Sequence, residues 1–256
     1  MTIVLRATRA WLTLFWLTFR RLLWSTSTLM VLLPLAGGAL FLLRRRFDQM
    51  SDVDVAFQKF SEFVILVFVG FLVPVCALAY GTTSIGADRE DRTLVFLLIR
   101  PVPRWLMLLA KYAAAVPLAL GLATGGFYVY CRLAGEAGAM AYALFLPTIG
   151  FVALAYLGLF HLFAVLLRHS TIVALIYALF FEFLLGNMPG IVKCAAVNYY
   201  GRSIMYALGA ADGLNRPSWF EPISPDTAAR ALAGIAVGSL ALALVVFQCR
   251  EYRDLT

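Results

Sequence analysis

The chain has 256 residues, of which 62% are hydrophobic and 14% are charged, whereas soluble domains contain roughly 45–50% apolar and about 25% charged residues. Its mean hydropathy is +0.87. A protein core cannot bury an apolar excess of this size, so the composition excludes a water-soluble protein and predicts an integral membrane protein. The formal net charge of +7 fits basic residues that flank apolar spans, and it does not indicate a nucleic-acid partner.

The first 21 residues carry too many polar side chains for a membrane span, but they show a helical pattern. On a helix that turns about 100° per residue, one narrow sector holds Thr2, Arg6, Arg9, Thr13 and Arg20. The Trp and Phe side chains lie outside this sector. We therefore predict an amphipathic elbow helix over residues 1–21 that lies in the membrane surface. A cleaved signal peptide is the alternative, but no small-residue cleavage site follows.

Six apolar runs are candidates for spanning helices. They cover residues 22–43, 63–80, 112–131, 141–167, 171–186 and 231–249. We therefore expect an all-α membrane protein with six transmembrane helices in a single permease domain over residues 1–256. The distribution of Lys and Arg gives little help with orientation, because an inside amino terminus leaves Arg44, Arg45 and Arg46 outside.

Three ionisable side chains lie in or beside these runs. Glu182 is costly inside a membrane, so we expect it to face protein or a wet cavity. With Asn187 and Pro189, which break the helix behind it, Glu182 forms a candidate pathway or gate. We expect His161 to have a packing role and Lys111 to snorkel to the cytoplasmic interface.

The segment 187–226 is rich in Gly and Pro, which limits any helix there to short pieces. Its aromatic side chains suit a membrane interface: Tyr199, Tyr200, Tyr206 and Trp219. We expect an extracytoplasmic cap or a re-entrant segment here.

The segment 81–104 is charged and has a helical pattern. Thr82, Thr83 or Ser84 could cap a helix, acidic residues follow at its amino end, and Asp88 with Arg92 makes an i, i+4 pair. Pro101 and Pro103 stop the helix before the chain enters the next span. This pattern predicts a short helix across the membrane surface. A solvated connection between two spans is the alternative.

This segment resembles the signature of ABC type 2 exporter permeases, a family with permeases linked to multicopper enzyme maturation, gliding motility and bacteriocin export or immunity. Asp88 stands where the family usually has Glu. The other matching residues are Glu90, Thr93, Leu94, Leu97, Leu98, Pro101, Val102, Arg104 and Lys111. Arg92, Pro103 and Ala110 depart from the pattern, and the loss of a glycine at position 92 suggests a more continuous helix.

The resemblance implies that this segment is a cytoplasmic coupling helix that sits in a groove of a separate ATP-binding subunit. The residues expected to contact that subunit are Asp88, Arg89, Glu90, Asp91, Arg92, Thr93, Leu94, Leu97, Arg100, Pro101 and Arg104. The chain has no GxxxxGK[ST] phosphate loop. ATP and Mg would therefore be bound by the partner, and we expect no enzymatic activity, cofactor or metal in this chain.

The same resemblance implies two ATP-binding subunits, a second copy of the permease or a homologous one, and surrounding membrane lipids. The sequence leaves open whether an extracytoplasmic accessory protein is a further partner. GxxxG patterns at 121–125 and 234–238 allow close helix approach, and we expect them to pack within one subunit. The implied location is the bacterial cytoplasmic membrane, with both termini in the cytoplasm. An ATP-independent secondary transporter or channel is the alternative function, and no sequence feature identifies a substrate.

Overall fold

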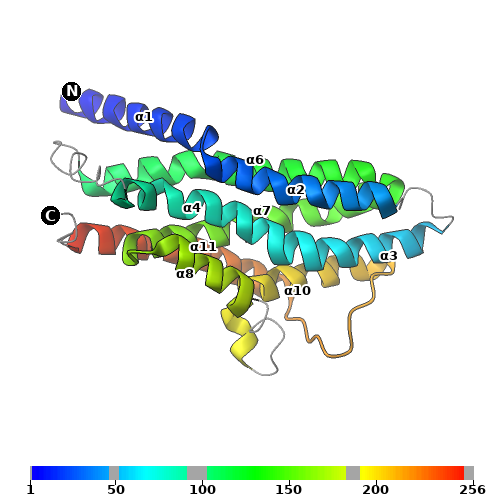
Figure 1. Ribbon diagram of the computed structural model, residues 1–256. Helices are drawn as coiled ribbons and strands as arrows, with labels where there is room; N and C mark the ends of the chain where they lie inside the picture. Colours follow the sequence, from blue (N-terminus) through cyan, green and yellow to red (C-terminus); the bar gives the residue numbers. More distant parts are fainter. Residues whose placement is uncertain (1, 46–51, 91–102, 183–190, 251–256) are drawn as a thin grey trace.

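The computed structural model describes residues 2–45, 52–90, 103–182 and 191–250, and all regular elements in these ranges are helices (Figure 1). In chain order they are α1 (Thr2–Leu23), α2 (Thr26–Arg45), α3 (Val53–Phe63), the π-helix η2 (Val64–Leu72), α4 (Val73–Glu90), α6 (Arg104–Leu133), α7 (Gly135–Leu166), α8 (Ser170–Ile176), the π-helix η3 (Tyr177–Phe181), the 3-10 helix η4 (Ile191–Ala195), α10 (Val197–Gly209), the 3-10 helix η5 (Ala210–Asp212) and α11 (Pro225–Cys249).

Five helices in the described ranges are long and apolar enough to cross a membrane. They are Thr26–Arg45, Val53–Gly86, Arg104–Leu133, Gly135–Leu166 and Pro225–Cys249. The predicted fifth span, residues 171–186, differs from this description, because its apolar helix covers only Ser170–Phe180. A span needs about 20 residues, so the described part of this segment is too short, and the count of six is not confirmed.

Helix α7 lies at the centre of the bundle, where it packs against α4, α6, α10 and α11. In an apolar stretch of 18 residues in α7, 67% of the residues are buried inside the chain. The corresponding share is only 17% in α2 and 22% in α11. Large rings fill the contacts around α7, including Phe57 of α3 against Phe145 and Tyr177 of η3 against Phe160. Lipid or another chain must therefore cover the outer helices.

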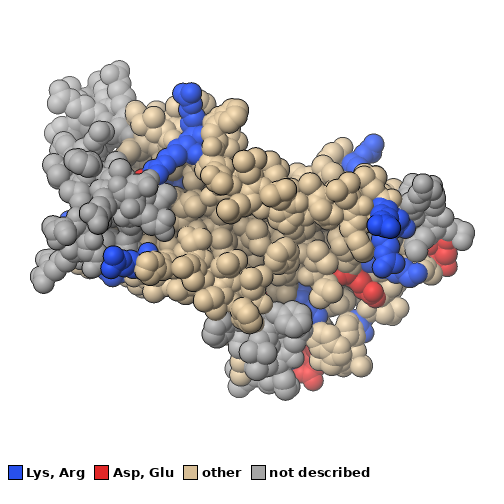
Figure 2. All heavy atoms as spheres, in the orientation of Figure 1, with Lys and Arg blue, Asp and Glu red and all other residues tan. Residues whose placement is uncertain are grey.

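The surface of the bundle agrees with this expectation. On the face seen in Figure 2, the middle of the molecule carries almost no charged side chains, and most Lys and Arg side chains lie toward its ends. Leucines of α2 such as Leu29 and Leu33 are among the most exposed apolar residues. Apolar side chains exposed over the full length of a helix are typical of a membrane environment.

A helix is present at the position of the predicted elbow. Helix α1 packs along α6, and Figure 1 shows it at a shallow angle to α2. It does not lie across the ends of the spans. After Leu23 the chain bends, and the hydroxyls of Ser25 and Thr28 both donate to the carbonyl of Leu22 at 2.8 Å. The location of α1 in the membrane surface stays a prediction.

The segment 187–226 folds onto the bundle. Helix α10 has 13 residues and packs against α7 and α11. Gly201 permits this contact, because a Cβ there would lie 2.7 Å from Val152. The expectation that Tyr199 and Tyr206 line a membrane interface is wrong, since both are buried against the chain itself; Trp219 is exposed.

One arginine of α10 is also enclosed. The guanidinium of Arg202 lies 4.7 Å from the ring centre of Phe220 and 5.3 Å from that of Trp219. Burial lowers the pKa of Arg202. These cation–π contacts hold the loop after α10 against the helix.

Candidate functional site

The first part of the predicted coupling segment belongs to a spanning helix. Residues 81–90 are the last turns of α4. The Thr82 hydroxyl donates to the Leu78 carbonyl at 2.8 Å, and the Ser84 hydroxyl donates to the Gly81 carbonyl at 3.1 Å. The prediction that these hydroxyls cap the start of a new helix is therefore wrong, because they bond back within α4.

The rest of the segment is described only in part. Residues 91–102 lie outside the described residues, and with them Asp91, Arg92, Thr93, Leu94, Leu97, Arg100 and Pro101. The backbone of Arg89 and Glu90 belongs to α4, but their side chains are also outside the description. Arg104 is the exposed first residue of α6, and its guanidinium donates to the carbonyl of Arg250 at 3.4 Å.

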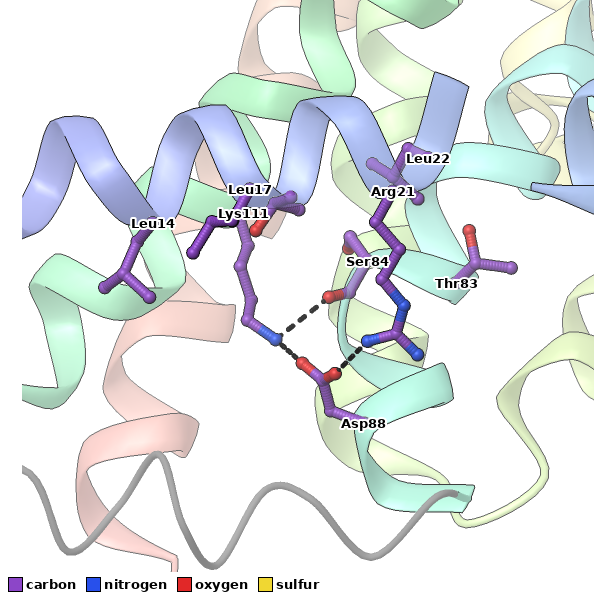
Figure 3. A pocket seen from close by; sticks show the side chains of 9 residues that line it. Leu14, Leu17, Arg21, Leu22, Thr83, Ser84, Asp88 and Lys111 are labelled. Carbon is purple, nitrogen blue, oxygen red and sulfur yellow. Dashed lines mark hydrogen bonds and ion pairs between the residues drawn. The ribbon is translucent and has the colours of Figure 1, made fainter. Parts of the chain in front are cut away.

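A polar cluster lies where α1, α4 and α6 meet, and we define it as Arg21, Ser84, Asp88, Lys111 and His161. The Arg21 guanidinium donates to Asp88 Oδ1 at 2.5 Å, and Lys111 Nζ forms an ion pair with Asp88 Oδ2 (Figure 3). Lys111 also donates to the Ser84 carbonyl at 3.2 Å. A buried charge without a partner is costly. In this cluster, the buried charges of Asp88 and Lys111 each have a partner of opposite charge.

Two predictions for this cluster are wrong. Asp88 was expected to offer its charge to another subunit, but its residue is only 5% exposed and its carboxylate faces Arg21 and Lys111. Lys111 was expected to reach the interface, but it is only 4% exposed. Asp88 and Lys111 are buried because α4 continues to Glu90, past the predicted end of its span at residue 80. Helix α1 packs against α6 and against α4, and covers the two side chains.

His161 of α7 extends the cluster inward. Its Nδ1 lies 3.0 Å from the Ser84 hydroxyl, and the Tyr112 ring packs edge-on with a centroid distance of 5.2 Å. The imidazole is fully buried. These contacts agree with the packing role expected for His161. No sequence spacing indicates its contact with Ser84, because 77 positions separate the two residues.

Glu182 faces protein, as expected for a carboxylate in an apolar segment. Its Oε1 and Oε2 accept the backbone N–H groups of Val197 and Asn198, each at 3.0 Å. These N–H groups begin α10, where an acidic side chain is favourable. The phenols of Tyr156 and Tyr177 lie beside the carboxylate. Glu182 therefore fastens the end of η3 to the start of α10.

The gate predicted around Glu182 is not tested by these contacts. Asn187 and Pro189 lie outside the described residues. Glu182 and His161 have different hydrogen-bond partners and do not pair with each other. In the part of the chain that the structure describes, no group of three or more His, Cys, Asp or Glu side chains could hold a metal ion.

The two GxxxG patterns do not pack inside the chain. A Cβ at Gly121, Gly125, Gly234 or Gly238 would meet no atom within 4 Å. The expectation that they serve packing within one subunit is therefore wrong. The close approach of α11 to the bundle is made at Gly158 of α7, where a Cβ would lie 2.8 Å from the Ala236 carbonyl oxygen.

The long apolar helices and the apolar outer surface define a multi-pass helical membrane protein. The family model described as ABC-2 family transporter protein matches residues 13–252, so the chain belongs to this family. The match covers nearly the whole chain and confirms the resemblance to ABC-2 type permeases. Comparison with curated proteins gives no match.

Proposed function

We propose that this chain is the permease subunit of an ATP-driven exporter in the bacterial cytoplasmic membrane. A separate ATP-binding subunit, present in two copies, would bind ATP and Mg and would act on the permease through residues 81–104. The chain itself would have no enzymatic activity and no cofactor. Members of the ABC-2 family generally work with such a partner, and the family match is the first support for the proposal.

One observation carries the coupling part of the proposal. The segment that resembles the family signature joins α4 to α6 next to the polar cluster, and the cluster fastens α1 to both helices. A soluble ATPase that closes on ATP makes a rigid-body motion. A push on this segment would therefore move three helices together, because ion pairs connect them at their common end.

The arrangement of the termini supports a cytoplasmic location for both. In Figure 1, the start of α1 and the end of α11 lie at the same end of the bundle as the end of α4 and the start of α6. If this junction meets a cytoplasmic ATPase, both termini are cytoplasmic as well. Residues 187–226 would then include the extracytoplasmic cap, where an accessory protein could bind.

A second permease copy, or a homologous permease, would complete the pathway. The open glycine faces of α6 and α11 support this part of the proposal, because small residues allow two spanning helices to approach closely. Membrane lipids would cover the remaining apolar surface.

The test is purification of the tagged chain from its native host in mild detergent, with mass spectrometry of the proteins that elute with it. We expect a stoichiometric ABC ATPase with the wild type and its loss from a Glu90→Arg variant, since reversal of this charge opposes binding in the groove. Glu136→Arg is the matched control, because Glu136 is exposed at the turn between α6 and α7.

Two results would count against the proposal. Elution of the wild type without an ATPase, under conditions that preserve other such complexes, would favour an ATP-independent carrier or channel. Normal ATPase activity stimulated by transport in the Glu90→Arg variant would reject the assignment of the coupling segment.

A further inference from the structure

A groove lies at the turn between α6 and α7, at the end of the bundle opposite to the start of α1 and the end of α11 (Figure 1). Its volume is about 520 Å³, and small-ligand sites have volumes of roughly 300–1,000 Å³. All of its lining residues belong to the hairpin of α6 and α7: Tyr128, Cys131, Arg132, Gly135, Glu136, Ala139 and Tyr142. The groove therefore lies far from the proposed ATPase contact.

The tight turn between the two helices brings opposite charges to one groove. Gly135 has a φ of 65°, which glycine adopts without a steric cost, so α7 begins directly after α6. Arg132 in the last turn of α6 and Glu136 in the first turn of α7 are both exposed. Among the described residues, no ion pair joins these two side chains. The groove therefore presents a guanidinium and a carboxylate that can each bind a ligand group of opposite charge.

The length of α6 places these charges at the level of the lipid headgroups. The helix has 30 residues, so a rise of 1.5 Å per residue makes it about 45 Å long. A bilayer with its headgroup regions is about 40–45 Å thick. Arg132 in the last turn thus reaches the headgroups, and Tyr128 lies about one turn of 5.4 Å deeper. Tyr side chains are enriched at this depth.

Two tyrosine rings form the deeper wall of the groove. Tyr128 and Tyr142 meet edge to face with a centroid distance of 5.7 Å. Tyr142 also stacks on the buried Phe127 at 6.0 Å, which holds its ring in place. Tyr128 is 49% exposed, so its ring can contact an acyl chain. A soluble ligand would gain little from this exposed ring.

We propose that the groove binds a phospholipid whose headgroup combines a phosphate with a primary ammonium, as in phosphatidylethanolamine. Arg132 donates to the phosphate oxygens, Glu136 accepts from the ammonium, and Tyr128 packs on the glycerol and the upper acyl chains. The helix dipoles also favour these two charges at their helix ends, but the dipoles require neither a groove nor the tyrosine rings. This site needs no ATPase, so it holds or fails independently of the proposed function.

The experiment is native mass spectrometry of the purified full chain in detergent with equal amounts of phosphatidylethanolamine, phosphatidylcholine and phosphatidylglycerol. We expect the wild type to retain phosphatidylethanolamine in preference, because phosphatidylcholine has no ammonium N–H and phosphatidylglycerol has no cation for Glu136. Glu136→Gln should lower the retention of phosphatidylethanolamine by about tenfold, since one charge-assisted contact is lost, and should leave the other two lipids unchanged. Arg132→Gln should lower the retention of all three lipids, because all three carry the phosphate.

Asp226→Asn is the matched control. Asp226 is an exposed acidic residue in the first turn of α11, so this variant removes the same charge from a comparable helix end outside the groove, and we expect wild-type retention. Equal retention of the three lipids by the wild type would overturn the site. Unchanged retention of phosphatidylethanolamine by Glu136→Gln, or an equal loss in Asp226→Asn, would overturn it as well.

Phosphoethanolamine, the free headgroup, distinguishes a lipid from a soluble zwitterion. Added at millimolar concentration to the wild type, it should not displace phosphatidylethanolamine, because it lacks the acyl chains that contact Tyr128. Displacement would assign the groove to a soluble zwitterion and overturn the lipid proposal.

Discussion

The carboxylate of Asp88 lies between two cations that come from different helices. Arg21 is 67 positions away in the sequence, and both the Asp88 and Lys111 side chains are almost fully enclosed. A buried ion pair of this kind need not add stability relative to an apolar pair, but removal of one partner leaves an uncompensated charge. At the residue scale, the cluster is therefore sensitive to single substitutions.

Asp88→Asn should destabilise the protein by roughly 3–5 kcal/mol, because it leaves Lys111 buried without a counter-charge. Thermal unfolding in detergent should show a lower Tm. The double variant Asp88→Asn with Lys111→Met should recover part of the loss, since it removes the orphaned charge as well. Asp54→Asn is the control, because Asp54 is exposed near the start of α3. A Tm for Asp88→Asn equal to that of the wild type would show that the cluster does not contribute to stability.

Helix boundaries are decided at the scale of elements. Thr82, Thr83 and Ser84 have the side chains of good caps, yet α4 continues through them to Glu90. A cap requires a chain that turns, and here Gly81 packs closely on α7, with its Cβ position 2.9 Å from the Cβ of Phe160. The tertiary contact therefore favours continuation of α4. The amino end of α10 is served instead by Glu182, from another helix.

The contact between α7 and α11 should depend on the size of one residue. Gly158→Leu places a side chain where the Ala236 carbonyl oxygen lies 2.8 Å from the Cβ position, so α11 must move outward. Overpacking of this kind costs about 1–3 kcal/mol, and the Tm in detergent should fall. Gly150→Leu, on the same helix, has nothing within 4 Å and should leave the Tm near that of the wild type. Equal effects of the two substitutions would contradict the close contact.

For the whole molecule, the arrangement around α7 determines which surfaces remain for partners. The helices α2 and α11 bury little of their apolar surface inside the chain, and the GxxxG faces of α6 and α11 are open. The end of the bundle that holds the polar cluster combines α1, α4 and α6. One subunit thus leaves apolar sides for lipid or a second permease, and one end for the proposed ATPase.

Natural cysteines can test the proposed orientation. Cys194 in η4 and Cys249 at the end of α11 are exposed, whereas Cys76 and Cys131 are buried. A membrane-impermeant maleimide added to spheroplasts should label Cys194 and should label Cys249 only after permeabilisation. Cys194→Ser and Cys249→Ser variants assign the two signals by mass spectrometry. Labelling of Cys249 in sealed spheroplasts would place the carboxyl terminus outside and contradict the proposed topology.

The sequence alone predicted the membrane class, the approximate positions of all five long spans, the helix before α2 and the family. These properties depend on composition and on short linear patterns, which a chain carries before it folds. The predicted span over residues 22–43 corresponds to α2, which begins and ends a few residues later. The buried location of Glu182 was also predictable, because an ionised carboxylate in an apolar run must find polar partners.

Only the tertiary structure decided which groups meet. Asp88 reaches Arg21 and Lys111 because α1 packs beside α4 and α6, and no spacing in the sequence encodes that contact. Glu182 receives its two hydrogen bonds from the first residues of α10, which are 15 and 16 positions further along the chain. The glycines of the GxxxG patterns face outward while Gly158 makes the close approach, because a helix has several faces and only packing selects the one that is buried.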